Sequence, residues 1–205
     1  MEHLARAPGA DKCVNMLIMK SSAHTRRMEA SSRSLARCGA VAACLGGVSY
    51  GAWGYLDNPD VSGFVIAVVV PMLSITTPAL FLGGLVGLYY WLGRGGSLLK
   101  RIGLLVGLVG SLLGLFNGLD WWELEWSILL FAGLTVLGVG MVVEDPPRLL
   151  GVLVLVSGTL GWVSLLTDPA FSGVLVPMRP VHVVFAALFC LSWVAWGGVL
   201  FRSAS

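Results

Sequence analysis

Charged residues are scarce in this chain, and long stretches have none. Asp, Glu, Lys and Arg make up 12% of the 205 residues, against about 25% in average soluble domains. Residues 61–92 contain no ionisable side chain except Tyr89 and Tyr90, and residues 102–119 contain none. With 57% apolar residues and a mean hydropathy of +0.86, the composition excludes an ordinary soluble protein and predicts an integral membrane protein.

Sequence motifs for catalysis and for cofactor binding are also absent. The chain has no His-Glu-x-x-His, no phosphate-binding loop and no glycine-rich nucleotide turn. Its four cysteines form no Cys-x-x-Cys pair and lack metal-ligand spacing, so we interpret them as small packing residues. No basic patch is interleaved with aromatic residues, which argues against nucleic acid as a partner. We therefore expect no metal, no cofactor and a non-enzymatic protein.

Apolar runs of about 20 residues, which suffice to cross a bilayer as helices, fill most of the chain. They predict an all-α fold, an integral membrane bundle of six transmembrane helices with short loops within residues 37–205. The predicted spans are 39–56, 71–92, 102–119, 121–143, 149–167 and 180–201. Because Pro71 cannot donate a backbone hydrogen bond, we expect it to mark the start of the second span, with 64–70 as an apolar or kinked lead-in.

Basic residues predict the orientation of these spans. Seven of the thirteen Lys and Arg lie in residues 1–37, and most of the others fall in the connections on the same side. Since Lys and Arg tend to remain in the cytoplasm, both termini are predicted to be cytoplasmic and the protein to lie in the cell membrane. Residues 1–36 are polar and basic and are predicted to form a disordered tail. Met16, Met19 and Met28 are alternative start sites within it.

Small residues indicate where helices approach closely. Gly47 and Gly51 are four residues apart in the first span. Five glycines, Gly103, Gly107, Gly110, Gly114 and Gly118, follow one face of the third span. Small residues at such spacing allow close helix packing in membranes, so we expect the third span at the centre of the bundle.

A short motif occurs twice. Residues 57–72 (DNPDVSGFVIAVVVPM) and 167–178 (TDPAFSGVLVPM) share an acidic or amide residue before proline, Ser-Gly and Val-Pro-Met. Four spans separate the copies, which places both on the outer side of the predicted bundle. A duplication is one interpretation. Asn-Pro and Asp-Pro are also ordinary helix starts, with the side chain as cap and proline in the first turn.

The second span contains the one polar cluster expected at depth, formed by Ser74, Thr76, Thr77 and Pro78. Proline removes a backbone hydrogen bond and kinks the helix, and broken helices of this kind expose backbone to substrate in transporters. Serine and threonine hydroxyls also compensate such kinks without any transport role. The cluster is therefore predicted as a ligand or transport path, or as a structural kink.

A second candidate site lies in the predicted outer connections, which are rich in carboxylates. Its members are Asp57, Asp60, Asp120, Glu123, Asp168, Arg179 and His182. Such oxygen and nitrogen donors suit a cation. Helix capping explains most of these residues and is the simpler interpretation. Tryptophans near this side, Trp53, Trp121, Trp122, Trp126 and Trp162, are predicted to form an interfacial aromatic belt.

Three functional hypotheses follow. The favoured one is a non-enzymatic accessory or lipid-interacting membrane protein, whose partners are the bilayer and other membrane subunits or further copies of itself. The alternative is a small transporter or channel subunit that uses the Pro71–Pro78 segment. The third is an enzyme acting on lipid at the outer face through Asp120, Glu123 and His182.

Overall fold

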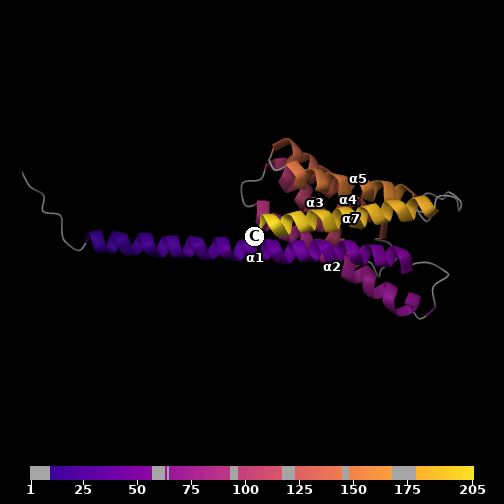
Figure 1. Ribbon diagram of the computed structural model, residues 1–205, viewed down its shortest axis with the longest axis horizontal. Coiled ribbons are helices and arrows are strands. Elements are labelled where there is room, and N and C mark those ends of the chain that lie inside the picture. The colour runs from indigo at the N-terminus through magenta and orange to yellow at the C-terminus, as the bar shows by residue number, and fades with distance from the viewer. Residues whose placement is uncertain are drawn as a thin grey trace, which may run out of the picture.

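The computed structural model describes residues 10–56, 63, 65–92, 97–116, 123–144, 148–167 and 179–205. Within these ranges the chain is helical throughout, with short turns and no strand. The elements are α1 (Ala10–Leu56), a π-helical turn η1 (Val65–Val69), α2 (Val70–Leu92), α3 (Leu98–Gly114), α4 (Glu123–Glu144), α5 (Arg148–Thr167) and α7 (Arg179–Ser203). Figure 1 shows them side by side along one axis, with α1 projecting beyond the rest.

Five helices in the described part of the chain are long and apolar enough to cross a membrane. These segments are Glu29–Ala52, Ala67–Leu92, Trp126–Glu144, Leu149–Thr167 and Val181–Ser203. The described residues confirm the prediction of an all-helical fold, and these five segments have the length and composition expected of a membrane-embedded protein. The remaining helix, α3, has 17 residues.

The bounds of α2, α4, α5 and α7 lie within two residues of the predicted spans, whereas α1 and α3 differ from theirs. The structure starts α3 at Leu98 instead of 102, because Ser97 caps the helix and its side chain accepts a hydrogen bond from the backbone nitrogen of Lys100. The basic residues Lys100 and Arg101, which suggested a loop, therefore belong to the first turn of α3. Before α2, the turn η1 provides the predicted kinked helical lead-in.

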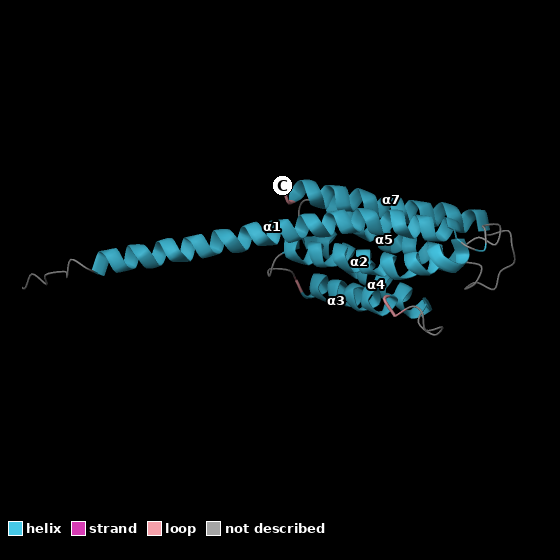
Figure 2. Cartoon of the chain, turned by 90° about the horizontal axis from the view of Figure 1, so that it is seen from below, coloured by secondary structure: helices cyan, strands magenta, loops and turns pink. Residues whose placement is uncertain are grey.

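The six α-helices of the described residues form a closed ring. In ring order the neighbours are α1, α2, α3, α4, α5 and α7, and α7 packs against α1. The contact between α2 and α3 is the sparsest of these six. Figure 2 shows the helices running alongside one another in the bundle.

Glycines set the distance between neighbours and show that they run antiparallel. In α3, a Cβ added at Gly103 would meet the backbone of Leu137, and one at Gly110 would meet the backbone of Leu130. Gly107 and Gly133 face each other between these two contacts. Each turn forward along α3 is thus matched by a turn back along α4, and their backbones touch because neither helix has a side chain in between.

The four described glycines of the stripe, from Gly103 to Gly114, pack closely as predicted, and Gly118 lies outside the described residues. The prediction that α3 lies at the centre is wrong. Its opposite face exposes Leu98, Ile102, Leu105, Val109, Leu112 and Phe116. A helix with one glycine face and one face of large exposed apolar side chains can bury only the glycine face against protein. In an apolar solvent the other face costs little to leave uncovered, so α3 lies on the perimeter.

The first helix is much longer than the predicted span of 39–56. It is continuous from Ala10 to Leu56 and extends over most of the segment for which the sequence predicts a disordered tail. Figure 1 shows that this part leaves the bundle as a single helix without a neighbour. We call the projecting part, residues 10–34, the arm. The C-terminus lies beside α1 where the arm leaves the bundle.

Candidate functional site

The predicted polar cluster of α2 divides between two faces of the helix. The hydroxyl of Ser74 donates to the carbonyl oxygen of Pro71 at 2.8 Å, and that of Thr76 donates to Met72 at 2.7 Å. Thr76 is exposed on the outside of the bundle, whereas Thr77 and Pro78 are buried. The structure therefore does not bring all four side chains together on one surface.

Thr77 joins α2 to α1. Its Oγ1 lies 2.7 Å from the Oγ of Ser49, and both residues are buried. Sequence reasoning missed Ser49, although the spacing of small residues in α1 could have revealed it. Gly39, Ala43 and Gly46 contact α2 at steps of three or four residues, and Ser49 is the next step. A hydroxyl pair satisfies two polar groups that would otherwise lie unpaired in an apolar interior.

Pro78 packs between α2 and α3. A Cβ added at Gly114 would lie 2.8 Å from the Cβ of Pro78, so the proline ring occupies the space left by the glycine. The next contact along this interface is between Leu85 and Gly107. The kink-forming proline is thus covered by protein rather than by a polar path.

A second buried hydroxyl pair links α5 to α7, and sequence reasoning missed it. The Oγ atoms of Ser157 and Ser192 lie 2.7 Å apart. Ser157 also bonds to the carbonyl oxygen of Leu153, and Ser192 to that of Phe189. Each side chain is an isolated serine in an apolar run, which gave no sequence signal. The Ser49–Thr77 pair therefore joins α1 to α2, and the Ser157–Ser192 pair joins α5 to α7. The two pairs lie on either side of the contact between α1 and α7.

The predicted outer cluster lies largely outside the described residues. This holds for Asp57, Asp60, Asp120 and Asp168, and the side chains of Glu123 and Arg179, at the starts of α4 and α7, are not described either. His182 is described and half-buried, and its Nδ1 lies 2.9 Å from the carbonyl oxygen of Ser164. A histidine in this position donates to a backbone carbonyl and connects α7 to α5. Among the described residues no group of three His, Cys, Asp or Glu side chains could hold a metal.

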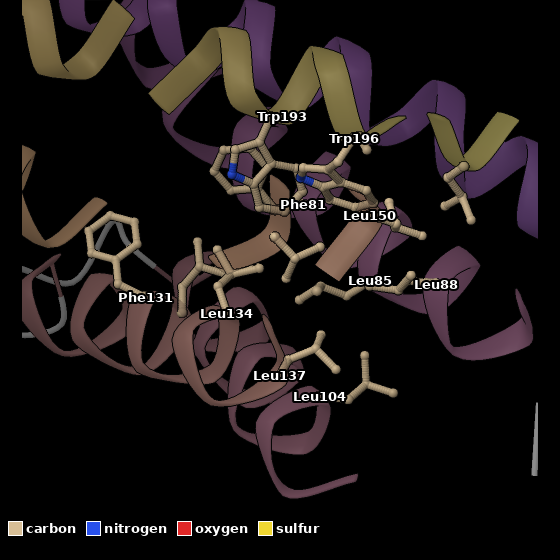
Figure 3. Close-up of a cluster of buried hydrophobic side chains, with 14 of the residues drawn as sticks. Phe81, Leu85, Leu88, Leu104, Phe131, Leu134, Leu137, Leu150, Trp193 and Trp196 are labelled. Carbon is tan, nitrogen blue, oxygen red and sulfur yellow. The ribbon is translucent and has the colours of Figure 1, made fainter. Parts of the chain in front are cut away.

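The centre of the ring is filled by aromatic side chains from different helices. Phe81 of α2 stacks on Trp193 of α7 with ring centroids 4.1 Å apart, and Trp196 lies 4.7 Å from Trp193. On the other side, Phe131 of α4 lies 5.3 Å from Phe189 of α7. Figure 3 shows Trp193 and Trp196 above Phe81, with leucines of α2 and α4 facing them. These side chains are buried and occupy the space that a central pathway would need.

The prediction that Trp126 joins the interfacial aromatic belt is wrong. It is 1% exposed and packs against Gly114 of α3. Trp162 is half-buried, with its ring 6.3 Å from that of Phe131. Gly114 leaves room for the indole ring of Trp126 inside the bundle, and burying this ring removes a large apolar area from contact with the surroundings.

One buried cation at the end of the bundle also escaped the sequence reasoning. Lys100 of α3 forms an ion pair with Glu144 at the end of α4, with 3.2 Å between Nζ and Oε2. The stem of Lys100 packs on Gly140, where a Cβ would lie 3.1 Å from its Cγ. Long basic side chains bury their stems and place the charge at a polar partner.

The described cysteines fit the interpretation as packing residues. Cys190 is buried beside Gly47 and Gly51, and Cys44 donates a weak hydrogen bond from Sγ to the carbonyl oxygen of Val194 at 3.5 Å. Cys38 is exposed.

Neither a protein-family model, nor a curated protein, nor a solved structure matches this chain.

Proposed function

We propose that this chain is a six-pass protein of the cell membrane, with both termini in the cytoplasm and α3 as one of the six spans. Two features support this topology. Neighbouring helices run antiparallel around the whole ring, α3 included. Arg37 near the start of the first span also reaches the carbonyl oxygen of Ala204 at the end of the last. These two ends share a side only if the number of crossings is even.

The length of α3 is compatible with a crossing. Seventeen residues at 1.5 Å per residue span about 25 Å, close to the hydrocarbon core of about 30 Å. The turn at Leu115 and Phe116 continues the chain beyond Gly114. Since α3 packs against α4 from Gly103 to Gly114, a membrane that α4 crosses also surrounds α3.

Cysteine labelling tests this topology. Asp57→Cys and Gly95→Cys, each in a background that carries Cys13→Ser and Cys38→Ser, should react with a membrane-impermeant maleimide from opposite sides of the membrane. The six-span scheme expects Gly95→Cys to react only after the cytoplasmic side is opened. Labelling of both positions from one side would refute it.

For the role of this bundle we propose a non-enzymatic accessory or lipid-interacting protein. The observation that carries this proposal is the stacked pair of Phe81 and Trp193 at the centre, both fully buried. Aromatic packing of this kind supports a solid scaffold rather than a conduit. The serine and threonine pairs between helices support the same view, because their hydroxyls bond to protein.

Crosslinking in native membranes followed by purification tests the accessory role. The chain should be recovered in a complex larger than its 21.7 kDa monomer. A monomer that remains alone after crosslinking, in membranes where a known subunit complex is captured, would contradict it.

A transporter subunit is the second candidate, and the break at the start of α2 favours it. The π-helical turn Val65–Val69 precedes α2, Pro78 interrupts its hydrogen bonding, and α2 makes its least contact with α3. Such helix irregularities are common at functional sites. Purified protein in vesicles should then show solute flux that Pro78→Ala abolishes while folding is retained. Absence of flux in the unmodified protein for ions and small neutral solutes favours the accessory role.

A further inference from the structure

The arm has no helix beside it, and it contains much of the chain's positive charge. Figures 1 and 2 show it leaving the bundle as a single helix. Residues 10–34 contain five Lys and Arg, namely Lys12, Lys20, Arg26, Arg27 and Arg33, against the two acidic residues Asp11 and Glu29. Arg33 and Leu35, at its junction with the bundle, are exposed. An isolated helix of this composition is marginally stable in water, so it needs a partner surface.

The sequence of the arm has the periodicity of a helix with two unlike sides. At about 100° per residue the five basic positions fall within an arc of about 140°. Val14, Leu17, Ile18 and Met28 fall on the opposite side, within an arc of about 100°. Both acidic positions lie away from the basic arc, whereas Met16 and Met19 lie within it. A basic side opposite a narrow apolar side is typical of helices that lie at a membrane surface.

The junction with the bundle is rich in serine, which allows a change of direction. Residues 31–34 read Ser-Ser-Arg-Ser, and the hydroxyl of Ser32 donates to the carbonyl oxygen of Glu29 at 2.8 Å. Serine side chains that bond back to the helix favour bends, and serine is a weak helix former. Just beyond, Arg37 is fixed to the C-terminal residues, so the bundle ends there.

We propose that the arm is an anchor for anionic lipid, and that it bends at Ser31–Ser34 to lie on the membrane surface from which it emerges. This inference rests on the proposed insertion of the bundle in a bilayer. The positive charge of the arm indicates anionic lipid as its partner, because basic segments next to a membrane span are attracted to acidic headgroups. The covalent connection to the first span favours the membrane over other acidic partners, because it keeps the arm close to this surface at all times.

The test uses the full chain with Cys38→Ser, in which Cys13 in the arm carries an environment-sensitive dye. The protein is reconstituted into vesicles of phosphatidylcholine alone or of phosphatidylcholine with phosphatidylserine, and an aqueous quencher is added. Quenching of the outward-facing dye should be slow on the anionic vesicles and fast on the neutral ones. It should become fast on both in about 1 M salt, where the Debye length is about 3 Å.

Two matched variants separate charge from shape. Arg26→Gln, Arg27→Gln and Arg33→Gln together should lower the ratio of bound to free arm by about 100-fold, since each basic residue contributes about fivefold. The same three positions changed to Lys should retain binding. Equal quenching on neutral and anionic vesicles would overturn the proposal, and so would unchanged protection in the glutamine variant. The lipid composition is the same on both leaflets, so the result does not depend on which side the arm emerges, and topology is tested separately by the labelling of Asp57→Cys and Gly95→Cys.

Discussion

Arg37 in the first span donates from Nε to the carbonyl oxygen of Ala204 at 3.0 Å, and from Nη2 to an oxygen of Ser205 at 3.0 Å. A guanidinium at this position binds carbonyl groups that the end of α7 leaves without intrahelical partners, and its charge opposes the negative end of the helix dipole. The start of α1 within the bundle is thereby fastened to the end of α7.

Arg37→Ala should weaken this connection without unfolding the bundle. The bonds are partly exposed, so we expect a loss of about 1 kcal/mol, seen as a lower midpoint of thermal unfolding in detergent. Arg33→Ala, an exposed arginine one turn earlier, is the matched control and should leave the midpoint unchanged. An equal effect of both variants would show that the Arg37 bonds do not contribute.

Gly133→Ala should lower the free energy of unfolding far more than Gly198→Ala. A Cβ at Gly133 would overlap the backbone of Gly107, and α3 would have to move away from α4. We expect a loss of about 2 kcal/mol or more from overpacking. At Gly198 nothing lies within 4 Å of an added Cβ, so Gly198→Ala should be neutral or stabilising by up to about 1 kcal/mol. Unfolding in mixed micelles measures both, and similar stability of the two variants would contradict the observed packing of α3 on α4.

The hydroxyl pair of Ser49 and Thr77 can be measured by a double-mutant cycle. Ser49→Ala or Thr77→Val alone leaves one buried hydroxyl without its partner and should cost about 1 kcal/mol. The double variant should cost less than the sum, with a coupling of about 0.6 kcal/mol, as found for polar contacts between membrane helices. Strictly additive losses of stability would mean that the 2.7 Å contact between the two hydroxyls contributes no coupling free energy.

The ion pair of Lys100 and Glu144 predicts an asymmetry between its two deletions. The lysine side chain is 5% exposed and the glutamate side chain 33%. Glu144→Gln deprives a buried ammonium of its carboxylate, whereas Lys100→Met leaves a carboxylate that water can still reach. We therefore expect Glu144→Gln to lower the free energy of unfolding more, by about 2 kcal/mol against about 1 kcal/mol. The reverse order would contradict this account.

The helix positions were largely predictable because the bilayer dictates them. Apolar length and proline placed the start of α2 within one residue of Val70, and basic loops located the helix ends. Glycine spacing predicted close packing but not the partner, so α3 was wrongly placed at the centre. A glycine face marks contact without saying whether the opposite face meets protein or lipid, because both are apolar.

The interior polar contacts were less predictable. Hydrogen bonds such as Ser157 to Ser192 join helices 35 positions apart, and one serine in an apolar run has no periodic signal. Lys100 was read as a loop residue because charge within a span is costly. The fold lowers that cost by placing Gly140 beside its stem and Glu144 at its tip.

The aromatic centre also bears on how the chain is synthesised. Helix α7 is made last, and it contributes Phe189, Trp193 and Trp196 to the contacts with Phe81 and Phe131. Until α7 leaves the ribosome, the inner faces of α2 and α4 have no aromatic partners, and α1 has no neighbour to which Arg37 can bind. The ring therefore closes only after α7 has been made, and a chain truncated before α7 exposes an incomplete interior to the quality control of the membrane.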